Sequence, residues 1–321
     1  MTTPDPIPVF VDCDTGIDDA LALAYLLAEP AVRVVGIGTV SGNVSATQAA
    51  RNTLALLELA GRTDVRVAIG ATNPLRGQFH GGAPHVHGVD GVGGIGLVPR
   101  ASAVVATSAI DLLRDLAQEW GGRLRVLALG PLTNLAHFTT THPASLPLIA
   151  DVVVMGGAFD HPGNITAVAE ANIHNDPDAA AAVFDADWHL TVVPLDVTMR
   201  HVLSEQDATA IAAIAGELPV RLAQMLGTYF DFYERVYGIR QCALHDPLAA
   251  IVAAGTVGVT TNGRPIEMSV ITEGPDRGLT VARASRGKRH ERRIVREVAE
   301  PASQTLIKQL RAHPWHAQSR A

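Results

Sequence analysis

The sequence contains few of the residues on which several classes of protein depend. Only two of its 321 residues are cysteine, and only two are lysine. Cys13 and Cys242 cannot supply the framework of a disulfide-rich secreted domain. Each is better explained as a small residue near a crowded site than as a nucleophile.

Positive charge and long apolar segments are also scarce. The formal net charge is −7 and the start of the chain has no basic block, so neither nucleic acid nor an anionic membrane surface is an expected partner. No apolar run reaches the length of a membrane span. The first residues, MTTPDPIPVF, lack the basic and apolar regions of a secretory signal. We therefore expect a cytoplasmic protein.

Hydrophobic residues, in contrast, are abundant and fall into alternating strand-like and helix-like runs. They make up 47% of the chain, which is enough for a large core. Short runs rich in β-branched residues, such as 32–40 and 124–130, alternate with helical patterns such as 46–61 and 107–122. No linker, repeat or low-complexity tract interrupts them. The pattern predicts an α/β protein with βαβ architecture and one domain over residues 1–321.

Further strands are expected at residues 65–70, 151–157 and 190–197. Near the end of the chain, the runs at 279–284 and 293–298 flank the only strongly basic stretch of the sequence. We interpret these two runs as a hairpin with a solvated tip.

Four aspartates lie within eight residues, between the first strand-like run and the first helix-like run. Asp18 and Asp19 fall at the start of the helix, where the helix dipole and free amides favour negative charge. Asp12 and Asp14 lack this explanation, since like charges at the end of a buried strand repel unless a cation or hydrogen-bond donors compensate them. Oxygen-only ligands indicate a hard cation, Ca²⁺ or Mg²⁺.

Polar segments also follow the other predicted strands. They are SGN with Asn43, PLTN after 124–130, the long segment that follows 151–157, and LHDP with Asp246. In an open α/β sheet ligands bind beyond the carboxyl ends of the strands, so we expect these segments to converge.

Taken singly, these residues have plain structural explanations. Asp246 precedes a proline at a helix start and suits an N-cap, and His245 alone is more often structural than catalytic. Asn164, Glu170 and Asn172 suit loops and helix caps. Together, however, the segments supply carboxylates, amides and imidazoles without a phosphate-binding glycine loop ahead of a lysine. That mixture suits a polyhydroxylated neutral ligand.

The ordered set of motifs resembles that of the calcium-dependent nucleoside hydrolases of the inosine–uridine preferring type. It comprises DCDTGIDDALAL, SGN, HGVDGVGG, GPLTNLA, MGGAFDHPGNITAVAEANIHNDPDAA and LHDPLAA. The resemblance implies a Rossmann-like nucleoside hydrolase fold, with one open, mostly parallel but mixed sheet and helices on both faces. It also implies hydrolysis of the N-glycosidic bond of purine or pyrimidine ribonucleosides to ribose and free base, and a homodimer or homotetramer.

The resemblance further implies a Ca²⁺ site and two catalytic residues. Asp14 would take a proton from the metal-bound water, and His245 would protonate the leaving base. The implied metal ligands are the carboxylates of Asp14, Asp19 and Asp246 and a backbone carbonyl at Leu129. The residues implied to hold sugar and base are Asp18, Asn43, His87, Asn164, Glu170, Asn172, Tyr229 and Tyr233. Asp12 is left with a structural role.

One position departs from the family pattern. Thr15 stands where the family usually has proline, which restores a backbone donor and removes a fixed φ angle. The base-side histidine, and tryptophans that all lie outside the motifs, favour a broad or pyrimidine-tolerant specificity over strict use of purines.

Two other interpretations remain open. VDCDTG also imitates the strand end of haloacid dehalogenase-type phosphatases, with Asp12 as nucleophile and Asp14 as acid. Those enzymes need a distant lysine, and neither Lys288 nor Lys308 is followed by the paired acidic motif that would hold Mg²⁺. Alternatively, the chain is a non-catalytic protein that binds nucleosides through Ca²⁺.

Overall fold

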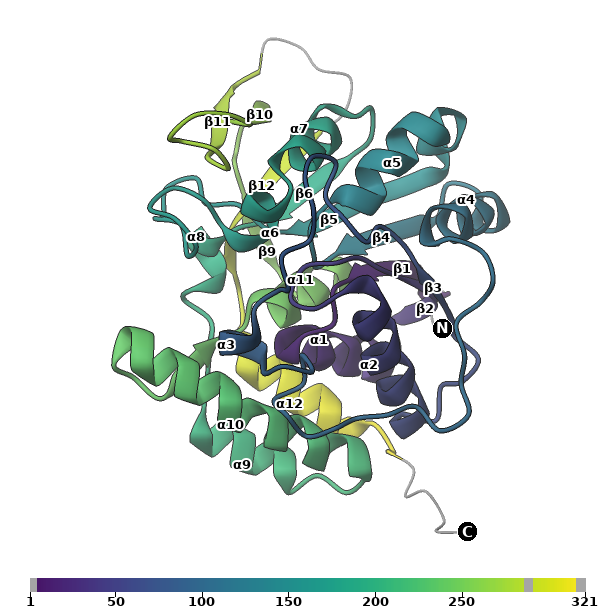
Figure 1. Cartoon of the computed structure of the whole chain (residues 1–321), viewed down its shortest axis with the longest axis vertical. Helices are drawn as coiled ribbons and strands as arrows, with labels where there is room; N and C mark the ends of the chain where they lie inside the picture. Colours follow the sequence, from purple (N-terminus) through teal and green to yellow (C-terminus); the bar gives the residue numbers. More distant parts are fainter. Residues whose placement is uncertain (1–4, 286–290, 316–321) are drawn as a thin grey trace.

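The fold is built on one eight-stranded sheet. The computed structural model describes residues 5–285 and 291–315. The strands of the sheet are β1 (Ile7–Cys13), β2 (Val32–Thr39), β3 (Arg66–Ile69), β4 (Leu124–Ala128), β5 (Ile149–Met155), β6 (Leu190–Val193), β9 (Val259–Thr261) and β12 (Arg292–Val298). Their order is β3-β2-β1-β4-β5-β6-β12-β9 (Figure 1). All neighbours are parallel except β9, which is antiparallel to β12. The predicted open, mostly parallel, mixed sheet is confirmed.

Helices cover both faces of this sheet, as predicted. Along β1, Val9 and Val11 enter one hydrophobic core while Phe10, between them, enters the other. The first core is covered by α1 (Ile17–Ala28), α2 (Ala46–Leu59), α10 (Glu217–Tyr237), α11 (His245–Ala254) and α12 (Ala302–Ala312). The second is covered by α4 (Ala109–Trp120), α5 (Thr133–Thr141) and α7 (Pro177–Asp185).

Shorter elements complete the structure. They are α3 (Pro84–His87), the 3₁₀-helix η1 (Pro143–Leu148), α6 (Ala171–Asn175), α8 (Leu195–Thr198) and α9 (Glu205–Ala212), with β7 (Val202–Ser204), β8 (Gln241–Ala243), β10 (Ile266–Val270) and β11 (Thr280–Ala284). Among the described residues, none of these helices or the longer ones has the length and apolar character needed to span a membrane.

The helix that follows the aspartate motif is buried along its whole length. All twelve residues of α1 are buried, which explains why its apolar residues are not confined to one stripe. Its N-cap is Gly16, whose N–H donates to Asp19 Oδ2 at 2.7 Å. The first turn of α1 is therefore held at the carboxyl end of β1, with Asp18 and Asp19 buried beside the loop.

Two sequence predictions about strands were wrong. The run 190–197 is not one strand, because β6 ends at Val193 and Pro194 leads directly into α8. The run 279–284 does not form a hairpin with 293–298, because β11 pairs with β10 while β12 pairs with β6 and β9. Residues 286–290, at the expected hairpin tip, lie outside the described residues.

Candidate active site

The predicted polar segments meet at the carboxyl edge of the sheet. Asp14 follows β1, Asn43 lies beyond β2, and Leu129 follows β4. Because these strands are parallel, their carboxyl ends lie at the same edge. Hydrogen bonds join segments far apart in sequence there: Asn43 bonds Asp14, and the Asn172 side chain donates to the Leu129 carbonyl at 2.7 Å.

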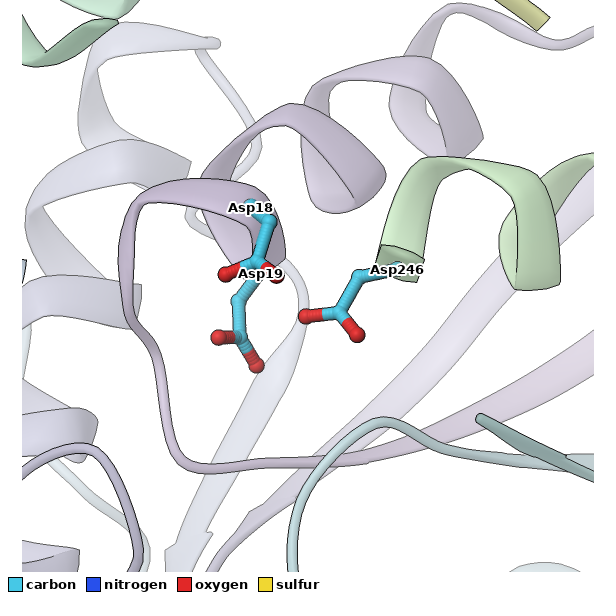
Figure 2. Close-up of side chains that lie close together, drawn as sticks. All are labelled: Asp18, Asp19 and Asp246. Carbon is cyan, nitrogen blue, oxygen red and sulfur yellow. The ribbon is translucent and has the colours of Figure 1, made fainter. Parts of the chain in front are cut away.

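Three buried carboxylates from two helices form the centre of this edge. Asp18 and Asp19 lie in the first turn of α1 and Asp246 in the first turn of α11 (Figure 2). One oxygen from each lies within 4.8 Å of the others. The N-cap role that Asp246 would suit if taken singly belongs to Leu244, and Asp246 is the second residue of the helix. Its carboxylate is therefore directed at the other two.

This acidic cluster lacks the partners that buried carboxylates need. Burial first, and then repulsion from Asp18, raises the pKa of Asp19 to about 7. Burial, with repulsion from the neighbouring aspartates, also raises the pKa of Asp246 well above its usual range. Within the described residues, Oδ1 of Asp18 and Oδ1 of Asp19 are buried without a hydrogen-bond partner. A hard cation held among these carboxylates would offset the repulsion, so the donor set fits Ca²⁺ or Mg²⁺.

Asp14 lies beside this cluster and is linked to it through Asn43. The Asn43 N–H donates to Asp14 Oδ2 at 2.6 Å, and its side-chain amide lies 3.3 Å from both Asp14 Oδ1 and Asp19 Oδ2. Burial and the charge of Asp19 raise the pKa of Asp14. A side chain at Gly42 would run into the Asp14 carboxylate, so glycine is required there. Asp18, rather than Asp14, completes the trio with Asp19 and Asp246.

Both ring nitrogens of His245 have hydroxyl partners. Thr198 Oγ1 lies 2.8 Å from Nδ1, and the Tyr233 hydroxyl lies 2.9 Å from Nε2. Burial lowers the pKa of His245. The ring of Tyr233 meets that of Tyr229 edge-on at 5.1 Å, and the Tyr229 hydroxyl donates to Asp18 Oδ2 at 3.2 Å. The tyrosines of α10 therefore connect the histidine to the acidic cluster.

Thr198 was missed by the sequence reasoning. It is the last residue of α8, directly after the run 190–197 that the sequence pattern predicts as a strand. The signal was Pro194, which stops the strand at the same edge of the sheet where the other polar segments were found.

His87 is held in one orientation against the start of α1. Its Nδ1 accepts the Ile17 N–H at 3.2 Å, which leaves the proton of the neutral ring on Nε2. Burial lowers the pKa of His87, and its ring lies 5.5 Å from that of Tyr229. A side chain at Gly16 would collide with this ring. α3 thus places His87 over the acidic cluster, with Nδ1 3.9 Å from Asp18 Oδ1.

The side chains of the other residues predicted to bind the sugar, Asn164, Glu170 and Asn172, form hydrogen bonds with backbone groups. Glu170 is the N-cap of α6 and accepts three backbone N–H groups. Asn164 is exposed and accepts the N–H of Ala171 at 2.9 Å. Within the described residues, neither they nor Asn172 hydrogen-bond to the acidic cluster. Glu170 therefore has the helix-capping role that its sequence position suits.

The two unusual residues of the first motif have structural partners. Thr15 is fully buried, and its hydroxyl lies 2.7 Å from that of Thr53. The threonine therefore anchors the loop to α2 where the family usually has proline. Asp12 is 1% exposed and accepts the Asn134 amide at 2.7 Å. A nucleophile needs access to its substrate, so this position does not suit the phosphatase interpretation.

Comparison with known proteins decides the family. The model of the family described as inosine-uridine preferring nucleoside hydrolase matches residues 9–305. The chain belongs to this family. This membership confirms the predicted ribonucleoside hydrolase, an N-glycosyl hydrolase, and sets aside the phosphatase alternative.

Individual relatives match over most of their length. Uridine nucleosidase 1 of Arabidopsis thaliana is 34% identical over 275 residues, covering 83% of this chain and 82% of that protein. The pyrimidine-specific ribonucleoside hydrolase RihA of Salmonella newport is 35% identical over 242 residues, covering 75% and 77%. The structure of a purine-preferring ribonucleoside hydrolase from Gardnerella vaginalis superposes with a TM-score of 0.89 at 32% identity, covering 95% of this chain and 98% of that one.

Proposed function

We propose that this site cleaves the N-glycosidic bond of purine and pyrimidine ribonucleosides with a Ca²⁺ ion in the acidic cluster. The observation that carries the proposal is the convergence of three buried carboxylates, two of which keep an oxygen without a partner. A Ca²⁺ ion held by these carboxylates would have coordination positions left for ribose hydroxyls. The reaction needs an oriented water, support for a cationic sugar and a proton for the base.

The residues divide these tasks between two sides of the ribose. When bound, Ca²⁺ supplies a fixed positive charge that orients the attacking water and the ribose diol. Asp14, Asp19, Asp246 and the Leu129 carbonyl hold the ion, and Asp14 takes the proton of the attacking water. Asp18, Asn43, Asn164, Glu170 and Asn172 hold the ribose hydroxyls and surround the flattening ring with negative charge.

The base side is formed by His245, Tyr229, Tyr233 and His87. His245 delivers a proton to the leaving base, on the opposite side of the sugar from the water. Since Tyr233 occupies Nε2 of His245 in the structure, the hydroxyl either moves aside for the base or passes the proton on. Both arrangements keep the histidine as the source of the proton.

Base preference, assembly and domain count complete the proposal. The relatives and solved structures include both pyrimidine-specific and purine-preferring hydrolases, so we assign a broad specificity that includes pyrimidines. We further propose a homodimer or homotetramer of a chain that forms one domain over residues 1–321.

A nucleoside panel tests reaction, metal and specificity together. Uridine, cytidine, inosine, adenosine and guanosine are incubated with the protein, and ribose release is measured as reducing sugar before and after chelation and after Ca²⁺ is added back. We expect release that is lost with chelator and restored by Ca²⁺. Binding of nucleosides without any ribose release would favour the non-catalytic alternative. Release that withstands chelation would remove the metal from the mechanism.

A further inference from the structure

Two adjoining cavities lie at the edge of the sheet opposite the acidic cluster. They open at the amino ends of β4, β5, β6 and β12 and have volumes of about 290 Å³ and about 400 Å³. No sequence motif and no proposed catalytic residue lies there. Five polar or charged residues line both cavities: Arg125, Asp151, Thr191, Glu291 and Arg293.

The sheet register places four of these residues on one face, as two cross-strand pairs offset by two residues. Arg125 is the cross-strand partner of Asp151, and Thr191 is the partner of Arg293. Thr191 also pairs with Val153, which is two residues from Asp151 and therefore on the same face. The two pairs lie on four strands, on the face that α11 covers. The Arg125 guanidinium donates to the carbonyl of Ala253 in the last turn of α11, whose first turn carries Asp246.

Several polar groups among these residues are left without partners. Arg125 Nε is buried and has no hydrogen-bond partner, since the nearest carboxylate oxygen, Asp151 Oδ2, lies 3.8 Å away. Thr191 is 6% exposed, and its hydroxyl makes no hydrogen bond within the described residues. An unpaired buried donor such as Arg125 Nε is unfavourable, and the Thr191 hydroxyl is open to the cavity, so this end of the sheet is suited to a polar ligand.

The positive and negative side chains shared by the two cavities are equal in number, which favours a neutral ligand. Two guanidiniums, of Arg125 and Arg293, face two carboxylates, of Asp151 and Glu291, and Arg293 and Glu291 pair with each other. A charged ligand would leave one charge uncompensated in a partly buried site. A neutral ligand that offers acceptors to Arg125 and a donor to Asp151 would leave none.

We propose that this cavity binds a neutral, planar heterocycle with an N–H group beside a carbonyl, which is the chemistry of a free nucleobase. The carbonyl accepts from the part of the Arg125 guanidinium that lines the cavity and from the Thr191 hydroxyl, and the N–H donates to Asp151. A flat ring also suits the planar guanidinium of Arg293. The identification with the released base rests on the proposed function, because a nucleoside hydrolase produces such a molecule at every turnover.

Equilibrium dialysis with radiolabelled uracil and hypoxanthine tests the proposal on the full-length protein. We expect two classes of binding site, one at the catalytic edge and one at the cavity. Thr191→Val removes a hydroxyl with little change in shape, and Arg293→Gln removes a guanidinium that is 47% exposed. Each should weaken the second class at least tenfold and leave the rate of nucleoside hydrolysis unchanged. Arg66→Gln is the control, since Arg66 lies at the start of another strand in an exposed ion pair with Glu119.

Base binding that is identical in the wild type and both variants would overturn the proposal. So would tight binding of inorganic phosphate at this cavity in place of the base. If Thr191→Val fails to fold, as judged by near-ultraviolet circular dichroism, Arg293→Gln decides the question alone. The assay needs no turnover: loss of hydrolysis with base binding intact would count against the proposed function only.

Discussion

At the scale of single residues, the site depends on carboxylates that are unfavourable where they lie. Asp14, Asp19 and Asp246 are almost completely buried, and burial raises the pKa of each. No Lys or Arg forms an ion pair with them in the described part of the chain. Because no side chain of opposite charge compensates these carboxylates, they are suited to binding a metal cation.

The effect of Asp19→Asn on stability should therefore change sign with the metal. In metal-free protein the substitution removes one of several repelling charges and should raise the free energy of unfolding by about 1–3 kcal/mol. In saturating Ca²⁺ it removes a ligand, so the variant should be less stable than the wild type and lose about 10³-fold in activity or more.

Thermal unfolding with chelator and with Ca²⁺, together with elemental analysis, checks this prediction. Asp160→Asn is the matched control, because Asp160 lies near the same edge of the sheet but is 74% exposed at its side chain. Unchanged calcium content in Asp19→Asn would show that the ion lies elsewhere.

The loss of activity on removing His245 should be larger for substrates whose leaving group needs a proton to depart. His245→Ala should lower turnover of uridine and inosine by about 10²-fold or more, the scale of general acid catalysis. p-Nitrophenyl riboside releases a phenolate that needs no proton, so its turnover should barely change. Tyr233→Phe removes only the hydroxyl on Nε2 and separates a relay from direct donation. Equal losses on all substrates, with calcium retained, would reduce His245 to a positioning role.

At the scale of elements, the sequence predicted strands and helices better than their partners. β2, β3, β4 and β5 and helices α1, α2 and α4 lie where the periodicity placed them. The prediction of a hairpin near the end of the chain was wrong, although both of its runs do form strands. The local sequence does not indicate that β12 pairs with β6 in the main sheet. Pairing over long sequence separations is decided by the whole core and not by the run itself.

For the candidate site too, the sequence predicted some features and not others. Asp18, Asp19 and Asp246 could be expected to converge, because the carboxyl ends of parallel strands share one edge. The partners of His245 could not be predicted from local pattern. Thr198 reaches it from a four-residue helix and Tyr233 from the long α10, and only the packed fold brings these elements together.

The segment between α3 and α4 depends on an acidic residue of α2. Glu58 accepts the N–H groups of Arg100, Ala101 and Ser102 at 2.6–2.9 Å. Although burial acts in the opposite direction, these bonds lower the pKa of Glu58 to about 2. The stability they give is present above the ordinary pKa of glutamate and is lost as the pH falls toward 2.

Glu58→Gln should loosen this segment without affecting the fold of the sheet. We expect the free energy of unfolding to fall by about 1–2 kcal/mol at neutral pH, since one amide oxygen replaces two carboxylate oxygens. Limited proteolysis should cut faster within residues 95–105 than in the wild type, while Glu119→Gln, an exposed substitution on α4, should change nothing. Identical cleavage rates would show that other contacts hold the segment.

At the scale of the whole molecule, the two edges of the sheet carry opposite arrangements of charge. The carboxyl edge gathers carboxylates alone, whereas the amino edge pairs each carboxylate with a guanidinium. α11 runs between them, with Asp246 in its first turn and its last turn held by Arg125. The strands β4 and β5 therefore contribute their carboxyl ends to the edge with the acidic cluster and their amino ends to the cavity on the other side.

Asp151 provides a test of how much stability the protein loses by keeping a carboxylate in that cavity. Burial raises its pKa to about 6 from 3.8, although Arg125, Arg293 and His189 all act to lower it. The folded protein thus holds this proton over a range where the unfolded chain has released it. Stability attributable to Asp151 is complete below pH 3.8 and is lost as the pH rises through about 6.

Asp151→Asn should therefore stabilise the protein at high pH and not at low pH. The gain in free energy of unfolding should grow between pH 4 and pH 7 and reach about 1–3 kcal/mol, less whatever attraction to Arg125 is lost. Denaturant unfolding across that range, with the exposed Asp115→Asn as control, measures it. A gain that is the same at every pH would contradict the shifted pKa. If Asp151→Asn is more stable at pH 7 but binds uracil less tightly, the carboxylate is retained for the ligand at the expense of the fold, as is common for residues of a binding site.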